Sequence, residues 1–166
     1  MISKIAIKIF HSQSRLDILE FASEPNEYKF LSPVTYFLGL EIIGTELPDS
    51  GILMDLGICK IKLKNIIKKL TGKIFIGTQD SSIEIEAYED SFRVRFEDRV
   101  YYEFPKELCY LIDCKNVNKK EICKVVGTEM RKNIDFEREV KGLLQFRVFI
   151  SNDRDCGKAE FKIKFI

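Results

Sequence analysis

Few side chains in this chain of 166 residues have the chemistry of a metal ligand or a proton shuttle. His11 is the only histidine, and a metal site built on one imidazole would need carboxylate partners such as Asp17 or Glu20. We interpret His11 as an ordinary polar residue of a loop or strand end.

The five cysteines also lack the spacing of a metal site. They form no C-x-x-C pair, and they are Cys59, Cys109, Cys114, Cys123 and Cys156. A cysteine zinc site would therefore require residues far apart in the sequence to converge. We expect reduced, wholly or partly buried thiols in a cytoplasmic protein.

Composition fits one compact domain spanning residues 1–166, since 45% of the residues are apolar. The formal net charge is only +1, and many lysines alternate with apolar residues, as at 4–9 and 161–165. This pattern is typical of solvated strand faces and argues against a nucleic-acid partner. No apolar run reaches the length of a transmembrane helix, and lysines at 4 and 8 interrupt any signal-peptide core, so we expect no membrane partner.

Alternating apolar residues predict most of the strands. They are expected at 2–10, 33–43, 82–88, 92–97, 99–104, 108–113, 143–151 and 158–166. Residues 11–30 carry turn-favouring stretches and are expected to form a long loop, and residues 48–51 to form a turn.

Two helices are predicted from apolar residues at steps of three and four. The first covers 58–70 and ends before Gly72, and its buried stripe comprises Leu56, Cys59, Leu63, Ile66, Ile67 and Leu70. The second covers about 119–132, where Asn118 and Glu121 have the spacing of a capping box. It is expected to bury Ile122, Val125, Val126 and Met130.

Several segments, in one consistent order, resemble the 6-pyruvoyl- and 6-carboxy-tetrahydropterin synthase family. The segment F-H-S-Q-S-R-L at 10–16 resembles F-S-A-A-H-R-L, and L-S-P-V-T-Y at 31–36 resembles L-H-G-H-x-Y. G-I-L-M-D-L-G at 51–57 resembles T-G-M-V-M-D-F-G. Weaker matches are F-P-K-E at 104–107 with D-C-K-N at 113–116, and R-V-F-I-S at 147–151 with A-E-F at 159–161.

The resemblance implies an α+β tunnelling fold (T-fold). Its parts would be an antiparallel four-stranded sheet, two helices on one face and a small β insert at about 82–104, similar to that of archaeal-type members. Members form trimers whose sheets join into a barrel, and trimers commonly stack into hexamers with active sites between subunits. The family activity is that of a zinc-dependent lyase.

The resemblance also assigns three zinc-binding histidine positions, which are occupied here by Ser14, Ser32 and Val34. A serine hydroxyl is a poor zinc ligand at neutral pH, and valine cannot coordinate a metal. His11 lies three residues from Ser14, so simple strand alternation places it on the opposite face. We therefore expect no zinc and no other cofactor.

The acid–base residues of the family are replaced as well. Thr71 and Gly72 stand where the family has an Asp-His pair, which leaves no obvious proton shuttle. The stretch before Ser32 lacks the family's cysteine, although Glu27 or Tyr28 could titrate there.

The glutamate that anchors the pterin aligns with Ile150, which cannot accept hydrogen bonds from it. Asp153 or Asp155 could approach from the adjacent turn, and Glu160 either lines the old pocket or is a solvated strand residue, the reading we favour. Asp55 and Asn116 match the family pattern, and Asp55 is expected to serve the start of the first helix.

Two functions follow as hypotheses. The first is a non-catalytic, oligomeric family member that binds a pterin-like ligand or acts as a scaffold. The second is a rewired, zinc-independent, lyase-like enzyme acting on a pterin or related planar heterocycle. The second hypothesis would need a new polar cluster, for example Asp153, Asp155, Glu160 and Lys73.

Overall fold

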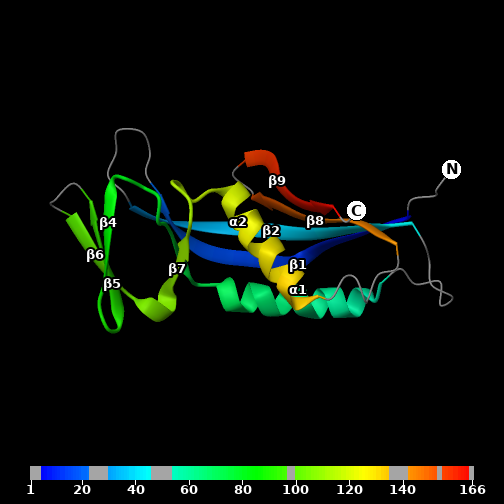
Figure 1. Ribbon diagram of the computed structural model, residues 1–166, viewed down its shortest axis with the longest axis horizontal. Coiled ribbons are helices and arrows are strands. Elements are labelled where there is room, and N and C mark those ends of the chain that lie inside the picture. Colours follow the sequence, from blue (N-terminus) through cyan, green and yellow to red (C-terminus); the bar gives the residue numbers. More distant parts are fainter. Residues whose placement is uncertain are drawn as a thin grey trace.

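A six-stranded sheet with two helices on one face forms the body of the molecule (Figure 1). The computed structural model describes residues 5–22, 30–45, 54–96, 100–134, 142–152 and 155–164. The sheet order is β7-β3-β1-β2-β8-β9. Its strands are β1 (Ile5–Ala22), β2 (Phe30–Gly44), β3 (Ile74–Gly77), β7 (Cys109–Ile112), β8 (Leu143–Asn152) and β9 (Asp155–Lys164).

A separate three-stranded antiparallel sheet lies at one end of the molecule (Figure 1). It consists of β4 (Ile83–Ala87), β5 (Ser91–Phe96) and β6 (Val100–Pro105), and the 3-10 helix η1 (Lys106–Leu108) follows it. These strands agree closely with the insert expected at 82–104. A second, smaller core joins them to the main sheet through Phe21, Ile74, Ile76, Val94 and Phe104.

The expected four-stranded sheet is wrong in its number of strands. β1, β2, β8 and β9 form the long antiparallel part, but β3 and β7 extend the sheet beyond β1 as parallel strands. Ile74 pairs with Leu19, and Cys109 pairs with Ile74. β7 lies within the strand expected at 108–113, whereas β3 has only four residues, too few for a pattern of alternation to reveal it.

The expected loop at 11–30 is wrong for residues 11–22 and for Phe30, because β1 runs on to Ala22 and β2 begins at Phe30. A register shift in the pairing of β1 with β2 interrupts the sequence pattern of this long strand. Phe10 pairs with Gly39 and Arg15 with Phe37, so five steps along β1 correspond to two along β2. Residues 23–29 and the turn expected at 48–51 lie outside the described residues.

The first helix, α1 (Leu56–Leu70), confirms the prediction within two residues of its start. Asp55 caps it by accepting a hydrogen bond from the Gly57 N–H at 2.7 Å. Gly72 has a φ of 78°, in the left-handed region that favours glycine, and the chain turns there. Leu56 differs from the prediction because it is exposed.

The second helix, α2 (Lys119–Asn133), also confirms its prediction. The Asn118 side chain accepts hydrogen bonds from the backbone N–H groups of Lys120 and Glu121. Glu121 does not complete a reciprocal cap, since its carboxylate pairs with Lys124 at 3.1 Å. Among the residues described, no helix has the length and apolar character needed to span a membrane.

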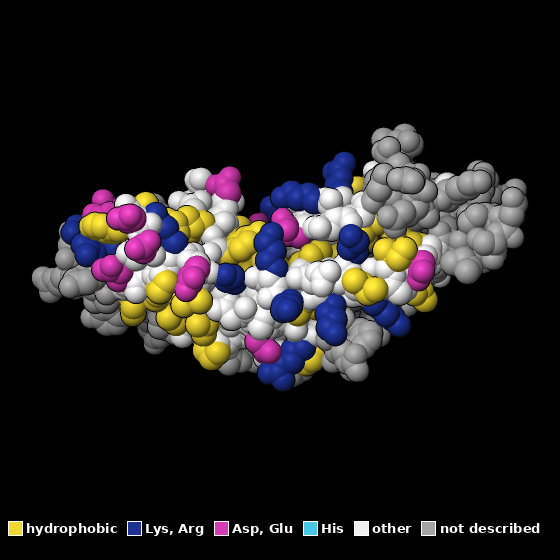
Figure 2. Space-filling view, turned by 90° about the horizontal axis from the view of Figure 1, so that it is seen from below, with side chains coloured by type: hydrophobic (Ala, Val, Ile, Leu, Met, Phe, Trp, Pro, Cys, Tyr) yellow, Lys and Arg dark blue, Asp and Glu magenta, His cyan; other side chains and the backbone are white. Residues whose placement is uncertain are grey.

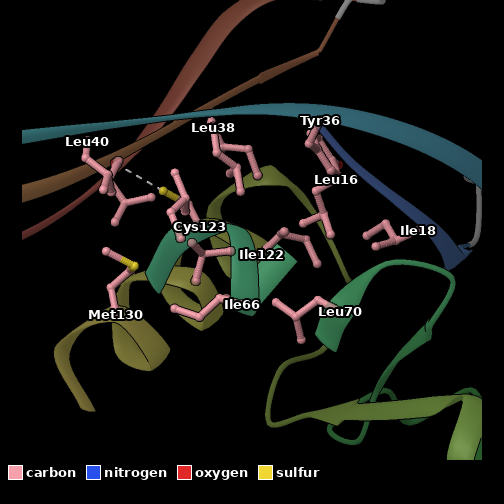
Figure 3. Packing of buried hydrophobic residues seen from close by; sticks show 14 of the residues in the cluster. Leu16, Ile18, Tyr36, Leu38, Leu40, Ile66, Leu70, Ile122, Cys123 and Met130 are labelled. Carbon is pink, nitrogen blue, oxygen red and sulfur yellow. Dashed lines mark hydrogen bonds between the residues drawn. The ribbon is translucent and has the colours of Figure 1, made fainter. Parts of the chain in front are cut away.

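The main core fills the space between the sheet and the two helices (Figure 3). Leu16, Tyr36, Leu38 and Leu40 come from the sheet, and Ile66, Leu70, Ile122 and Met130 come from the helices. Cys59, Cys109, Cys114 and Cys123 are free thiols, and burial raises the pKa of Cys123 to about 12. The Cys156 side chain lies outside the described part.

Glu129 connects the two helices, and its contribution to stability should depend on pH. Its carboxylate accepts hydrogen bonds from Lys69 Nζ at 2.9 Å and Lys132 Nζ at 3.2 Å. These contacts, with Lys69 first, hold the pKa of Glu129 below its ordinary value of 4.5. The stabilisation is therefore fully present above the unfolded-state pKa and is lost as pH falls through the folded-state pKa.

We expect Glu129→Gln to lower the free energy of unfolding by about 1 kcal/mol at pH 7, because a half-exposed ion pair is screened by solvent. Urea titrations at pH 7 and pH 3 measure the effect, which should shrink at the lower pH. Glu121→Gln, which removes a carboxylate paired only with Lys124 on its own helix, is the control. An equal loss at both pH values would contradict the assignment.

Candidate functional site

The positions that the family resemblance assigns to zinc lie on the neighbouring strands β1 and β2. Antiparallel pairing sets Val34 opposite Ile18 and Ser32 opposite Glu20. Ser32 and Val34 are two residues apart and so share the face that packs under the helices. Val34 is buried in the main core, Ser14 is also buried, and Ser32 is half-buried.

The turn that follows α1 lies against the same part of β1. The Gly72 N–H donates to the Asp17 carbonyl at 2.8 Å, and the Leu19 N–H donates to the Lys73 carbonyl at 3.0 Å. The two acid–base positions, Thr71 and Gly72, are therefore close to the β1 residues that pair with Ser32 and Val34. Thr71 is exposed, and its N–H ends the helix by donating to the Ile67 carbonyl at 2.8 Å.

A buried carboxyl–phenol pair lies at this place, and the sequence did not predict it. The Tyr36 hydroxyl donates to Glu20 Oε1 at 2.5 Å. Only 8% of Glu20 is exposed, and Tyr36 is deeply buried. Because Tyr36 pairs with Leu16 and Glu20 with Ser32, their hydrogen bond spans four residue positions along the sheet and passes the pair of Ile18 with Val34.

Comparisons with known proteins identify the fold. No protein-family model matches the chain, and no curated protein matches it significantly. Among solved structures, 6-pyruvoyl tetrahydropterin synthase from Plasmodium vivax gives a TM-score of 0.84 at 19% identity over 98% of this chain and 99% of that chain. The Plasmodium falciparum synthase gives 0.83 at 18% identity over 98% and 99%. The Caenorhabditis elegans synthase gives 0.54 at 8% identity over 99% and 98%.

The chain has the 6-pyruvoyl tetrahydropterin synthase fold. This confirms the expected α+β T-fold, with the longer sheet described above. The side chains at the three positions that the family resemblance assigns to zinc do not fit a zinc ion. Val34 supplies no donor, and the hydroxyls of Ser14 and Ser32 are poor zinc ligands at neutral pH.

Other side chains do not replace the three histidines in the described part of the chain. No group of three or more His, Cys, Asp or Glu residues there is placed to hold a metal ion. The side chain of His11 lies outside the described residues, and so do Glu27 and Tyr28.

Ile150 and Glu160, two of the residues expected near the pterin position, lie on opposite faces of the sheet. Ile150 is fully buried in the main core and pairs with Ala159 of β9. Glu160, the next residue of β9, therefore points to the opposite face, where it is exposed and forms an ion pair with Lys162. Asp155 begins β9 but its side chain is not described, and Asp153 lies outside the described residues.

The sheet face away from the helices carries paired charges. Asp17 accepts hydrogen bonds from Thr35 Oγ1 at 2.6 Å and Arg15 Nε at 2.8 Å, and these contacts, Thr35 first, hold the pKa of Asp17 below its usual value. Glu41 of β2 is paired with Arg147 of β8 at 3.0 Å. This face therefore carries ion-paired and hydrogen-bonded side chains, and no helix of the described residues covers it (Figure 1).

Tyr36→Phe tests whether the buried pair supports the fold. We expect the free energy of unfolding to fall by about 1–3 kcal/mol, because a buried carboxyl group loses a hydrogen-bond donor. The control is Tyr88→Phe, which removes a hydroxyl from an exposed tyrosine bonded to Glu86 and Arg93. Urea unfolding that gives equal losses for both variants would contradict the prediction.

Proposed function

We propose that this chain is a divergent member of the 6-pyruvoyl tetrahydropterin synthase family that no longer uses zinc. It acts as a non-catalytic, oligomeric protein that binds a pterin-like ligand or serves as a scaffold. One observation carries the proposal. Val34, at a position that the resemblance assigns to zinc, is part of the hydrophobic core, and the Tyr36–Glu20 hydrogen bond passes beside it.

The sheet supports the oligomeric part of the proposal. Helices cover one face, while the other face carries ordered charge pairs such as Glu41 with Arg147. β9 forms one edge of the six-stranded sheet, and within the described part of the chain no strand pairs with its outer side. Open edges of long strands are usually covered or paired. In a trimer or hexamer whose sheets join at their edges, the outer backbone groups of β9 would form hydrogen bonds with a strand of the next subunit.

A cytoplasmic location is also part of the proposal. The free thiols of Cys59, Cys109, Cys114 and Cys123 are compatible with a reducing compartment.

Metal analysis of the purified chain, combined with one designed variant, tests the proposal. We expect the natural chain to contain no stoichiometric zinc and to bind added zinc weakly in calorimetry. Ser14→His, Ser32→His and Val34→His together should create a zinc site if these positions have the family geometry. Stoichiometric zinc in the natural chain, or pterin turnover that a chelator abolishes, would overturn the proposal.

A second function has its own observation. Structures of the Plasmodium vivax synthase include variants in which a glutamate described as a catalytic residue is replaced. A carboxylate thus serves catalysis in a protein of this fold, and here Glu20 is buried beside Tyr36 at the degenerate zinc site. The alternative is a zinc-independent, lyase-like enzyme acting on a pterin or related planar heterocycle.

Pterin binding and turnover distinguish the two functions. The alternative predicts turnover without metal that Glu20→Gln abolishes while leaving pterin affinity largely unchanged. The main proposal predicts no turnover by either protein. Size-exclusion chromatography with light scattering should give a trimer or hexamer under both.

A further inference from the structure

The two helices carry a net positive charge that the rest of this nearly neutral chain offsets. α1 has five lysines and no acidic residue, a charge of +5, and α2 has five basic and two acidic residues, a charge of +3. The helices together carry +8 in a chain of net charge +1, so the remaining residues carry −7. The near-neutral net charge is therefore the sum of a strongly positive pair of helices and a negative remainder of the chain.

The segregation is visible on the face that the helices form. Figure 2 shows lysine and arginine side chains along the middle of this face, whereas acidic side chains gather mainly toward the three-stranded sheet. Lys60, Lys64 and Lys68 follow one another at steps of four along α1 and are exposed. Within the described residues these three lysines form no ion pair, so their charge is available to a partner.

Exposed isoleucines lie among these lysines. Ile61 is 61% exposed and Ile58 is 38% exposed, although both belong to a helix that buries its other side. The two are three residues apart, and Lys64 is three residues beyond Ile61, so they form one ridge on the outer side of α1. The outer surface of α1 is thus both basic and apolar.

We propose that the outer face of α1 and α2 binds an anionic membrane surface, which revises the sequence-based expectation of no membrane partner. Lysine is the main basic residue there, with Arg131 the single arginine, and lysine ammonium groups suit diffuse attraction to anionic lipid headgroups. The exposed isoleucines suit the boundary between headgroups and acyl chains, where apolar side chains are removed from water.

The same surface fits nucleic acid less well. Neither helix contains an aromatic residue that could stack on bases, and α1 lies flat against the sheet. Exposed isoleucines also gain little beside a phosphate backbone.

The inference goes beyond the proposed function, because it concerns the helix face and is independent of zinc or pterin binding. Joining of sheets at their edges would leave this face outside the oligomer and repeat it in every subunit.

Vesicle sedimentation with the full chain tests the inference. Phosphatidylcholine vesicles containing about one-third phosphatidylserine are the probe, and pure phosphatidylcholine vesicles are the lipid control. Binding should be confined to the anionic vesicles and should disappear at about 0.5 M salt. Lys64→Gln with Lys68→Gln should weaken binding roughly 30-fold, given the attraction of each lysine to an anionic surface.

A matched variant separates location from total charge. Lys162→Gln with Lys164→Gln removes the same formal charge from the opposite sheet face and should change binding less than threefold or so. Ile61→Ser should weaken binding roughly tenfold without altering charge. Circular dichroism and thermal melting verify that each variant is folded.

Three outcomes would overturn the inference. The first is failure of the natural chain to bind anionic vesicles at low salt. The second is an equal loss of binding in the two double-lysine variants. The third is tighter binding to DNA than to vesicles in the same buffer, which would assign the face to nucleic acid.

Discussion

Replacing Gly127 by alanine is expected to lower the free energy of unfolding by about 1–3 kcal/mol. A Cβ at this position would lie 2.1 Å from Cδ1 and 2.7 Å from Cε1 of Phe161 on β9. Real carbon atoms do not approach so closely, so the ring or the helix would have to move. Alanine would otherwise favour a helix over glycine by about 1 kcal/mol. Net destabilisation would therefore show that the contact of α2 with β9 outweighs helix propensity.

Two further variants make this prediction specific. Thr128→Ala changes the neighbouring, exposed position of α2 and should alter stability by less than about 0.5 kcal/mol. Phe161→Leu removes part of the ring, so the combination with Gly127→Ala should cost less than the sum of the two single changes. Additive losses, or a Gly127→Ala variant as stable as the natural chain, would rule out the close approach.

The helices were predictable because their signals are local. In α1, Cys59, Leu63, Ile66 and Leu70 recur at the helical period, and Gly72 follows the last turn. In α2, the Asn118 cap stands directly before the apolar stripe. Capping and periodicity depend on residues a few positions apart, so no tertiary information was needed.

The sheet was less predictable because its pattern depends on distant partners. The irregularity between Phe10 and Arg15 shifts the pairing of β1 with β2 and interrupts the alternation that defines a strand. β3 and β7 are short parallel strands that become part of the sheet only when the helices bring them beside β1. No local window of the sequence contains that information.

The candidate site also combines features that the sequence predicts with features that depend on distant partners. Family patterns point to Ser14, Ser32 and Val34, but they do not indicate which side chains fill the space between them. Tyr36 and Glu20 are 16 residues apart, and their contact follows from the antiparallel register of β1 and β2. Likewise, only the pairing of β8 with β9 shows that Ile150 and Glu160 lie on opposite faces of the sheet.

Arg147→Met is expected to lower the free energy of unfolding by about 3 kcal/mol. Arg147 pairs directly across the sheet with Glu41, and the guanidinium lies 3.0 Å from the carboxylate. Glu41 is only 3% exposed, so loss of the arginine would remove a cation that compensates a buried negative charge. The expected loss is at the low end of the range for buried pairs, because 28% of the arginine side chain is exposed.

The double variant Glu41→Met with Arg147→Met distinguishes the net contribution of the ion pair to stability from the destabilisation caused by removing only one partner. Two apolar side chains of similar length need no compensating charge, so the double variant should be more stable than Arg147→Met alone. Urea unfolding of the four proteins in the cycle measures the coupling, and strictly additive losses would contradict it. A double variant that recovers stability but no longer assembles would show that the ion pair contributes to contacts between subunits. Recovery of both stability and assembly would show that the ion pair only stabilises the sheet within one subunit.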